Sequence, residues 1–452
     1  MSELGIFNMG KFVISGGSPL RGEVFISGAK NVALKTVVAA LLTEEEVIID
    51  RVPLIADLFL MVETAKRLGV KIEIDEDRRT LFIRGGTLES NKIPLEVGAR
   101  IRTSSMFLSP LLSRFGEAII PNPGGCRIGA RPIDRHIEGL REMGAKIYYD
   151  PTDGYFHAEA ARLHGVDFTF SKNTHTGTET LILAAVKASG RTVLENAAQE
   201  PEVDDLIRLL NLMGAKIQRV TPRKIVIEGV KKLKGTRYKI MADRNEIVTF
   251  AIGALVSKGD VIIHGGQREY LKAFLGKVDE AGGGWEPKED TVTRFFYQKN
   301  FKPTNITTGP YPSFMTDWQA PWALLMTQAG GLSTIHETVY ESRFSYVFEL
   351  RKMGVKIEFF DPKVTDPQNF YNFNWADKKP NYHQGIKIFG PTSLHNAVLE
   401  ITDLRAGATL VLAAILAKGE SYLWGVEQID RGYEKIEERL KKLGADIKRT
   451  ED

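Results

Sequence analysis

The sequence has one cysteine, few histidines and little excess of charge of either sign. The single cysteine excludes an internal disulfide, and the eight histidines include no His-Glu-x-x-His helix or other common ligand spacing, so no metal site is predicted. The formal net charge is only +3, and the acidic and basic residues are interspersed. This pattern predicts no nucleic-acid partner and no membrane partner, and it favours small-molecule ligands.

Long apolar runs and nucleotide-binding signatures are also absent from the sequence. No stretch approaches about eighteen uncharged apolar residues, and the first residues lack the basic and apolar segments of a secretory signal. We therefore expect a soluble cytoplasmic protein. No Walker phosphate loop or dinucleotide glycine fingerprint occurs, so no cofactor is expected. A bound phosphate would have to be held by arginine, lysine and helix ends.

What the sequence does contain is a six-fold repeat. In each repeat a helical stretch ends on a short glycine-containing tag and continues into a strand, as in RLGVKIEI and KMGVKIEF. The tags lie 75, 70, 68, 72 and 90 residues apart, close to one supersecondary unit each. Glycine suits this position because a helix commonly ends on a residue with positive φ. The tag glycines are Gly69, Gly144, Gly214, Gly282, Gly354 and Gly444.

The same order of elements precedes each tag, namely an apolar helix, a short β-rich segment and a second, amphipathic helix. In the first repeat these are NVALKTVVAALLTEE, EVIIDRV and ADLFLMVETAKRLG. The first helices are apolar nearly all round, which predicts that they are buried. At 452 residues the chain exceeds the size of one core, so we expect an α/β protein of two domains with three repeats each.

The polar residues of these apolar helices gather at the N-terminal ends. A helix N-terminus offers unpaired N–H groups and a partial positive charge, which suit anions. If the repeats are related by pseudo-symmetry, the ends converge on one cleft with charges of both signs. Ordinary helix capping is the simpler alternative for any single end. The residues at or just before the ends are Lys30, Asn31, Arg102, Glu179, Arg244, Glu246, Asp317, Asp403 and Arg405.

Two further segments stand out from the repeats. Residues 361–385 form a long irregular stretch that accounts for the widest tag spacing, and we expect a surface insertion between strands there. The second segment, PNPGGCRIGARPIDRH, places the lone Cys126 after two glycines and beside Arg127. Guanidinium groups lower a thiol pKa, and glycines let a loop close over a ligand, so Cys126 is a candidate acid, base or nucleophile. The alternative is a small buried hydrophobe.

The motifs PGGCRIGARP, SGAKN, TDLRAG and IDRGYE together resemble those of the UDP-N-acetylglucosamine enolpyruvyl transferases of bacterial cell-wall synthesis. The resemblance runs from about residue 13 to the C-terminus. It implies two inverse α/β-barrel domains, each of three repeated βαβαββ-like units with buried helices, and an active site in the cleft between them. It places one domain at residues 30–241, and the other at residues 1–29 and 242–452.

The resemblance also implies an activity, related to that of the 3-phosphoshikimate 1-carboxyvinyltransferases. The enolpyruvyl group of phosphoenolpyruvate would be transferred to the 3′-hydroxyl of UDP-N-acetylglucosamine with release of phosphate, the first committed step of peptidoglycan precursor synthesis. Cys126 matches the mobile-loop cysteine that fosfomycin alkylates in the family, and Asp317 matches the general base. Together with Lys30 they form the expected catalytic set.

Further residues match the binding positions of the family. Planar guanidinium groups suit the carboxylate and phosphate of phosphoenolpyruvate better than ammonium groups do. The expected phosphoenolpyruvate contacts are Lys30, Arg102, Arg131, Arg405 and Arg431. The expected acceptor contacts are Asn31, Arg102, Arg131, Asp134, Lys172, Thr174, His175, Thr176, Asp317, Val339, Arg343 and Asp403.

The chain departs from the family pattern mainly on the acceptor side. It has THTGTE at residues 174–179, DRNE at residues 243–246, and Gln428 where a histidine is common. UDP-N-acetylglucosamine is the leading acceptor, and a different nucleotide or nucleotide sugar is the first alternative. A second alternative is a catalytically silent paralogue that binds a nucleotide sugar. The retention of Lys30, Cys126, Arg131, Asp317 and Arg405 argues against a silent paralogue.

Overall fold

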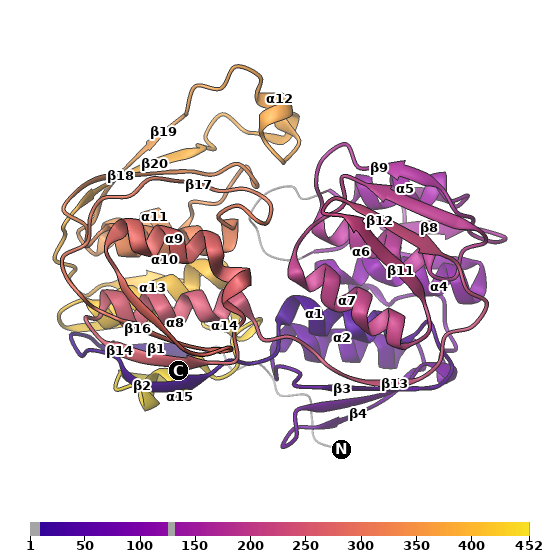
Figure 1. Ribbon diagram of the computed structural model, residues 1–452, viewed down its shortest axis with the longest axis horizontal. Helices are drawn as coiled ribbons and strands as arrows, with labels where there is room; N and C mark the ends of the chain where they lie inside the picture. The colour runs from indigo at the N-terminus through magenta and orange to yellow at the C-terminus, as the bar shows by residue number, and fades with distance from the viewer. Residues whose placement is uncertain (1–9, 125–131, 452) are drawn as a thin grey trace. The chain divides into compact units, whose positions relative to one another are not determined.

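The chain divides into two compact units in the computed structural model, which describes residues 10–124 and 132–451 (Figure 1). One unit holds the described residues 28–124 and 132–241, and the other holds residues 10–27 and 242–451. Two of the expected site residues, Cys126 and Arg131, lie outside the described residues.

The unit of residues 28–241 contains the first three repeats. The first repeat comprises α1 (Lys30–Ala40), β3 (Glu46–Asp50), α2 (Ala56–Arg67), β4 (Lys71–Asp75) and β5 (Thr80–Arg84), followed by the short η1 (Gly85–Thr87) and α3 (Leu95–Gly98). The second comprises η2 (Arg102–Phe107), α4 (Leu108–Phe115), β6 (Glu117–Pro121), α5 (Asp134–Glu142), β7 (Lys146–Asp150) and β8 (Tyr155–Glu159). The third comprises β9 (Asp167–Thr169), α6 (His175–Ala185), β10 (Arg191–Glu195), α7 (Pro201–Leu212), β11 (Lys216–Thr221) and β12 (Lys224–Glu228), and β13 (Thr236–Lys239) ends the unit.

The unit of residues 242–451 contains the other three repeats and the first two strands of the chain, β1 (Lys11–Ser15) and β2 (Arg21–Phe25). The fourth repeat comprises α8 (Arg244–Val256), β14 (Asp260–His264), η3 (Arg268–Leu271), α9 (Lys272–Ala281), β15 (Gly284–Glu289) and β16 (Val292–Phe296). The fifth comprises β17 (Ile306–Thr307), η4 (Thr316–Trp318), α10 (Gln319–Met326), β18 (Gly331–His336), α11 (Tyr346–Lys352), β19 (Lys356–Phe360), α12 (Pro367–Phe370), η5 (Trp375–Asp377) and β20 (Gly385–Gly390). The sixth comprises β21 (Val398–Glu400), α13 (Leu404–Leu416), β22 (Glu420–Trp424), α14 (Glu427–Asp430), α15 (Ile436–Lys442) and β23 (Asp446–Thr450).

Each repeat builds one small sheet with a constant plan. In the first five repeats the strand after the apolar helix pairs antiparallel with the second strand of a hairpin, and in the sixth β1 takes the place of that strand; a further strand adds in parallel at the other edge. The sheet orders are β13-β3-β5-β4, β6-β8-β7 and β11-β12-β10-β9 in one unit, and β15-β16-β14-β2, β17-β18-β20-β19 and β21-β22-β1-β23 in the other. In the second repeat the parallel strand is reduced to a bridge between Lys92 and Ile119.

Strands distant in the sequence complete three of these sheets. The strand β13 pairs with β3 of the first repeat, β2 pairs with β14 of the fourth, and β1 pairs with β22 and β23 of the sixth. Each unit is therefore closed by chain segments from its two ends, as expected for a ring of three repeats.

The apolar helices form the inside of each unit, as the sequence predicts. Every residue of α8 is buried, and so is nearly every residue of α13. One hydrophobic cluster is made only of residues between 29 and 240, and the second only of described residues between 12 and 26 and between 242 and 447. Both units are thus inverse α/β barrels, with sheets outside and helices within (Figure 1).

The tag glycines behave as predicted from the sequence. All six end their helices with positive φ, between 78° and 99°. A β-carbon at Gly69 would come within 2.9 Å of the Thr87 carbonyl oxygen, whereas a β-carbon at Gly214 would meet nothing within 4 Å. The backbone conformation, which side chains other than glycine adopt at a cost, is therefore the shared reason for glycine at these positions.

Two of the expected apolar helices are shorter than the sequence suggests. The segment from Arg102 begins as the 3-10 helix η2 before α4, and the segment from Thr316 begins as η4 before α10. Pro110 and Pro321 lie in the first turn of the following α-helix, which proline tolerates because no intrahelical bond needs its missing N–H there. The chain ahead of each proline takes the tighter 3-10 form.

None of the helices in the described part of the chain combines the length and apolar character needed to cross a membrane.

Candidate functional site

The N-terminus of α1 presents a buried lysine. Lys30 is the first residue of the helix, and its Nζ lies 2.8 Å from Oδ2 of Asp57 on α2. The two side chains are 10% and 6% exposed, so the ion pair is largely removed from water. The neighbouring Asn31 is only partly buried. The Asp57 carboxylate thus holds the Lys30 ammonium group in a defined position at the start of α1.

A second charged group lies between α1 and α6. Lys35 Nζ is 2.9 Å from Oε2 of Glu179, and His175 Nε2 is 3.2 Å from Oε1 of the same carboxylate. Burial alone would raise the pKa of Glu179, but His175 and Lys35 outweigh it and lower that pKa. Burial alone would lower the pKa of His175, but the Glu179 carboxylate outweighs it and raises that pKa. The Glu179 carboxylate therefore favours the protonated form of His175.

The expectation that Glu179 sits at a helix end is wrong. Helix α6 begins at His175 with Thr174 as its N-cap, whose side-chain oxygen accepts a hydrogen bond from the Gly177 N–H at 3.2 Å. Glu179 lies one turn further along and is completely buried. The helix starts earlier than predicted, because the Thr174 cap lies ahead of the apolar stretch on which the prediction was based.

The sequence analysis missed His136, which supports an expected acceptor residue. Its Nε2 lies 2.9 Å from the hydroxyl oxygen of Thr176. Burial, aided by the charges of Arg102 and Arg135, lowers the pKa of His136 to about 3, so the ring is neutral. Arg102 donates a hydrogen bond to the Pro132 carbonyl oxygen at 2.8 Å. The helix ends of the second and third repeats are thus linked through one imidazole.

The other acceptor residues expected in this unit are more open. Asp134 is exposed at the start of α5 and accepts a hydrogen bond from the Arg135 N–H at 3.0 Å. Lys172 is partly buried just ahead of α6, beside Asn173, whose side-chain amide donates to the Asn196 carbonyl oxygen at 3.3 Å. These residues stay predictions for acceptor contacts.

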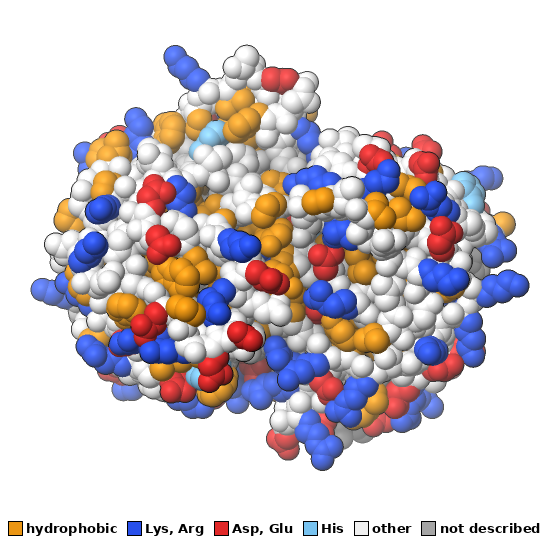
Figure 2. Space-filling view, viewed as in Figure 1, with side chains coloured by type: hydrophobic (Ala, Val, Ile, Leu, Met, Phe, Trp, Pro, Cys, Tyr) orange, Lys and Arg blue, Asp and Glu red, His pale blue; other side chains and the backbone are white. Residues whose placement is uncertain are grey.

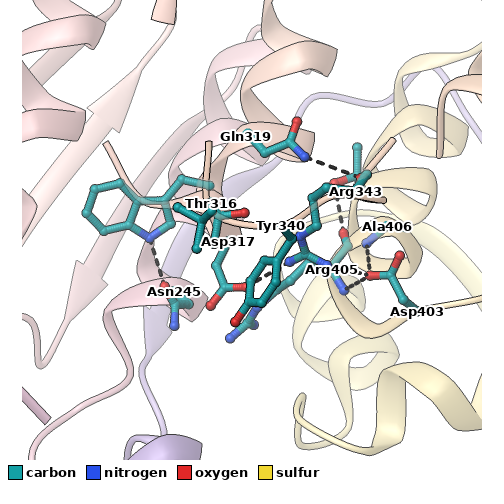
Figure 3. Close-up of polar contacts among 12 residues, drawn as sticks. Asn245, Thr316, Asp317, Gln319, Tyr340, Arg343, Asp403, Arg405 and Ala406 are labelled. Atoms are coloured by element: carbon teal, nitrogen blue, oxygen red, sulfur yellow. Dashed lines mark hydrogen bonds and ion pairs between the residues drawn. The ribbon is translucent and has the colours of Figure 1, made fainter. Parts of the chain in front are cut away.

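In the unit of residues 242–451, four expected residues form one ionic cluster (Figure 3). Arg343 donates to Oδ1 of Asp317 at 2.8 Å, and its other terminal nitrogen lies 3.5 Å from Oδ1 of Asp403. Arg405 Nε lies 3.8 Å from the same Asp317 oxygen. The Asp317 side chain is 26% exposed, whereas the side chains of Arg343 and Arg405 are only 5% and 6% exposed. One accessible carboxylate is therefore held by two buried guanidinium groups.

Helix caps set the geometry of this cluster. Oδ1 of Asp403 accepts hydrogen bonds from the backbone N–H groups of Arg405 and Ala406, both at 3.0 Å, and so caps α13. Its Oδ2 accepts from the Ser345 hydroxyl at 3.0 Å. Asp317, by contrast, lies within η4, and the residue directly ahead of α10 is Trp318. Capping accounts for the position of Asp403 at the start of α13.

The buried acid Glu337 is a further residue that sequence reasoning missed. One carboxylate oxygen accepts from the Val339 N–H at 2.7 Å and the Tyr340 N–H at 3.0 Å, and the other accepts from the Thr316 hydroxyl at 2.9 Å. Burial raises the pKa of Glu337 above its ordinary value. The carboxyl group thus joins the turn that carries Asp317 to the loop that carries the expected acceptor residue Val339. Glu337 lies in the segment ETVYESRF, which also contains the expected residue Arg343. That proximity in the sequence is the signal that could have identified Glu337.

The altered DRNE segment has structural roles in this unit. Asp243 caps α8 by accepting from the Asn245 and Glu246 N–H groups at 2.8 and 3.2 Å. The Asn245 side-chain oxygen accepts from the Trp318 indole N–H at 2.8 Å (Figure 3). Arg244 is buried, with its guanidinium 5.7 Å from the Trp318 ring centre. The asparagine therefore anchors the residue next to Asp317.

Two more arginine environments complete the described site. The Arg405 guanidinium lies 5.2 Å from the ring centre of Tyr433, whose hydroxyl is 2.6 Å from that of Thr249. Arg431 is partly buried and donates to the Gln428 side-chain oxygen at 3.4 Å. The glutamine that replaces the usual histidine thus contacts an expected phosphoenolpyruvate ligand.

Within the described residues, one group has the spacing of metal ligands. Ligand atoms of Asp150, Asp153 and His157 lie within 4.8 Å of one another at the β7–β8 hairpin. These side chains are partly exposed, and turn bonds occupy them, since Asp150 accepts from the Thr152 N–H at 2.8 Å. The hairpin cluster is separate from the residues described above.

Comparison with known proteins places the chain in a family. Residues 14–440 match the model of EPSP synthase (3-phosphoshikimate 1-carboxyvinyltransferase). The UDP-N-acetylglucosamine 1-carboxyvinyltransferase of Acidobacterium capsulatum is 42% identical over 98% of this chain and 96% of its own length. The protein of the same name from Hydrogenovibrio crunogenus is 41% identical over 98% of this chain and 100% of its own length.

Solved structures agree with the fold. The enolpyruvyl transferase NikO from Streptomyces tendae superimposes with a TM-score of 0.86 at 24% identity, covering 98% of this chain and 100% of NikO. EPSP synthase from Acinetobacter baumannii superimposes with a TM-score of 0.70 at 17% identity, covering 98% of this chain and 100% of that one. The family resemblance read from the motifs is confirmed: the chain belongs to the UDP-N-acetylglucosamine 1-carboxyvinyltransferase family of enolpyruvyl transferases.

Proposed function

We propose that this protein transfers the enolpyruvyl group of phosphoenolpyruvate to the 3′-hydroxyl of UDP-N-acetylglucosamine and releases phosphate. Full-length relatives at 41% and 42% identity bear the name of that enzyme. The observation that carries the proposal is the Asp317 carboxylate, partly exposed and held by the buried guanidinium groups of Arg343 and Arg405. Adjacent cations favour the ionised carboxylate, which is the form that accepts a proton.

The proposed reaction proceeds by addition and elimination. The acceptor hydroxyl oxygen bonds to the enol carbon as Asp317 takes the hydroxyl proton, and the methylene carbon gains a proton. The tetrahedral intermediate then loses phosphate, and the methyl carbon gives up a proton to restore the double bond. The proposed cationic contacts to phosphoenolpyruvate are those of Lys30, Arg102, Arg131, Arg405 and Arg431, which would stabilise the negative charge that develops on the oxygens. Cys126 is the proposed partner for proton transfer at the methylene carbon.

These contacts come from both units of the chain. Lys30 and Arg102 belong to one unit, and Arg405 and Arg431 belong to the other. The proposed reaction therefore needs the whole chain. The proposed setting is the cytoplasm, where the product would enter peptidoglycan synthesis, with no cofactor involved.

A second candidate keeps the reaction and changes the acceptor to another nucleotide or nucleotide sugar. The observation that favours it is the THTGTE segment, where His175 forms an ion pair with Glu179 and the Thr176 hydroxyl is engaged by His136. These side chains put an ion-paired histidine and an occupied hydroxyl where the expected acceptor contacts lie.

The test is phosphate release from phosphoenolpyruvate with UDP-N-acetylglucosamine, followed by mass spectrometry of the nucleotide sugar. We expect phosphate together with an adduct that has gained one enolpyruvyl group. Release with a panel of other nucleotides or sugars, and none with UDP-N-acetylglucosamine, would select the second candidate. A rise in melting temperature with ligand, without phosphate release for any acceptor, would identify a silent binder and overturn both candidates.

A further inference from the structure

The insertion between β19 and β20 is the largest departure of one repeat from the others. In the first repeat the equivalent hairpin, β4–β5, is closed by residues 76–79 alone. In the fifth repeat β19 and β20 also pair antiparallel, with Phe360 opposite Gly385, but residues 361–384 lie between them. The expectation of an insertion between strands is confirmed, and its extra chain includes α12 and η5 (Figure 1).

The first half of the insertion binds the end of β18 and the loop that follows it. The backbone N–H of Asn372 donates to the Thr338 carbonyl oxygen at 2.8 Å. The hydroxyl of Tyr371, a residue that is only 2% exposed, lies 3.0 Å from Nε2 of His336. Thr338 is itself fixed, because its hydroxyl donates to the Thr308 carbonyl oxygen at 2.6 Å.

The last residue of the insertion binds the same loop at two further points. The Gln384 carbonyl oxygen accepts from the Glu337 N–H at 2.8 Å. Its side-chain amide donates to the Glu341 carbonyl oxygen at 3.0 Å, and the residue is 1% exposed. Insertion residues 381–383 also line a cavity of about 550 Å³ together with Arg343 and Ser345. The insertion thus contacts the loop of residues 337–343 near both ends of that loop.

This loop carries expected acceptor residues into the site. It contains Val339, whose N–H is bound by the Glu337 carboxylate, and it ends at Arg343, which donates to Asp317. A shift of the loop would therefore move a proposed acceptor contact and a partner of the proposed base together. Displacements of this kind in positioning residues lower activity even when the reacting groups are unchanged.

The insertion is stabilised by packing among its own side chains, as a segment that positions another loop must be. The rings of Tyr371 and Trp375 stack 4.9 Å apart at 12°, and Phe373 stacks on Trp375 at 5.9 Å. The Lys378 ammonium lies 5.6 Å from the Trp375 ring centre. Stacked rings with a cation on their face stabilise a segment that has little regular structure. Phe370, the last residue of α12, is exposed. Hydrophobic side chains are also visible at the top of the view in Figure 2.

We propose that the insertion, residues 361–384, is a clamp that positions the loop of residues 337–343 and thereby sets the affinity of the enzyme for its acceptor. This inference rests on the proposed function, which supplies the acceptor. The short β4–β5 hairpin of the first repeat has no segment equivalent to the clamp. We do not expect the clamp to change the affinity for phosphoenolpyruvate, because none of the proposed phosphoenolpyruvate contacts lies in the loop of residues 337–343.

The kinetic test removes one backbone donor. Asn372→Pro deletes the N–H that binds Thr338, and the preceding Tyr371 has φ −78° and ψ 140°, a conformation that suits a residue before proline. Asn372→Ala is the matched control, because it removes the side chain and keeps the N–H. Lys379→Pro controls for proline itself, since Lys379 is exposed and follows Lys378 at ψ 117°.

We expect KM for the acceptor to rise about fivefold in Asn372→Pro, as for the loss of one hydrogen bond, with KM for phosphoenolpyruvate unchanged. Both control variants should retain the wild-type KM values. An unchanged acceptor KM in Asn372→Pro, or an equal rise in Lys379→Pro, would overturn the clamp.

A second measurement does not depend on activity. Amide hydrogen exchange of the peptide spanning residues 337–343 should be faster in Asn372→Pro and in Tyr371→Phe than in the wild type, and unchanged in Lys379→Pro. Equal exchange in all four proteins would refute the clamp even if UDP-N-acetylglucosamine is the acceptor. Faster exchange without phosphate release from the wild type would keep the clamp and reject the proposed function.

Discussion

At the scale of single residues, the chemistry depends on which charges are buried and which stay accessible. Arg343, Arg405 and Asp403 are buried and tied to one another or to helix ends, and only Asp317 keeps about a quarter of its side chain in solvent. A buried ion pair fixes its members because separating them exposes an uncompensated charge. This accessible carboxylate is therefore the one that we propose as the base.

The first prediction concerns Asp317. Asp317→Asn keeps the shape of the side chain and removes its ability to accept a proton, so we expect ligand-induced stabilisation to persist while kcat falls by roughly 10²–10⁴-fold. Calorimetric binding and phosphate release measure the two effects. Asp446→Asn, on the exposed face of β23, is the control. Near-normal phosphate release from Asp317→Asn would remove this residue from the role of base.

The second prediction uses His175 of the THTGTE segment and His136 of α5, which contacts that segment, because their pKa values move in opposite directions. The folded pKa of His175 is raised above 6.5, so its stabilisation is present below about pH 6.5 and is lost as pH rises through the folded pKa. The pKa of His136 is lowered to about 3, so between about pH 3 and 6.5 the unfolded chain binds a proton that the folded chain does not.

The measurement is the melting temperature against pH for His175→Gln and His136→Gln. We expect the destabilisation caused by His175→Gln to grow as pH falls from about 9 to 6. The destabilisation caused by His136→Gln should shrink as pH falls below about 6.5. The wild type loses stability in that range, because its His136 ring stays neutral in the folded state and is protonated in the unfolded state. Parallel pH profiles for the two variants would contradict this assignment of charge.

At the scale of elements, the repeat is a helix–strand–helix–hairpin unit that changes direction at a glycine. The positive φ of the tag lets the chain leave the amphipathic helix and enter the hairpin strand within a few residues. The same unit tolerates large additions at its hairpin, as the insertion before β20 shows.

The third prediction separates backbone strain from steric crowding at this turn. Gly214→Ala adds a methyl group where nothing lies within 4 Å, so the cost should be that of positive φ alone, about 1–2 kcal/mol in the free energy of unfolding. Gly69→Ala should cost more, because its β-carbon would also meet the Thr87 carbonyl oxygen at 2.9 Å.

Gly276→Ala is the control for the turn glycines. Gly276 lies inside α9, is exposed and has open space at the β-carbon position, so alanine should stabilise the protein by about 0.5–1 kcal/mol. Denaturant unfolding measures all three variants. Equal effects of Gly214→Ala and Gly276→Ala would show that the turn conformation is not what selects glycine.

At the scale of the whole molecule, the two units have separate cores. The two hydrophobic clusters share no residue, and each is confined to one unit. Charged side chains of both signs are interspersed over the face shown in Figure 2, in agreement with the small net charge.

The fourth prediction follows from the separate cores. Scanning calorimetry of the ligand-free protein should resolve two unfolding transitions. Gly214→Ala should lower the one that belongs to residues 28–241, and Gly354→Ala, where a β-carbon would press on the His395 ring at 3.2 Å, should lower the other. A single transition that both variants shift equally would mean that the units unfold as one cooperative body.

Much of this architecture was predictable from local sequence alone. Helix burial, the glycine turns and the hairpin insertion depend on hydrophobic periodicity and backbone conformation, which neighbouring residues determine. The motifs PGGCRIGARP, SGAKN, TDLRAG and IDRGYE were sufficient to predict the family. The position of Glu179 was misread, because the Thr174 cap starts its helix earlier than the apolar pattern indicates.

Only the tertiary structure decided which side chains meet. The links between Lys35 and Glu179, His136 and Thr176, and Glu337 and Thr316 join residues from different elements, and no local pattern encodes those distances. The same holds for the insertion, since its hydrogen bonds to residues 337–341 depend on how a long loop folds back on its own sheet. The sequence by itself therefore determined the repeat and the buried helices, because these follow from short-range patterns, and its motifs indicated the family, which in turn implied the inverse barrels. Which charges are buried, which carboxylate stays accessible and what the insertion holds in place depend on contacts between distant residues, and packing alone settles them.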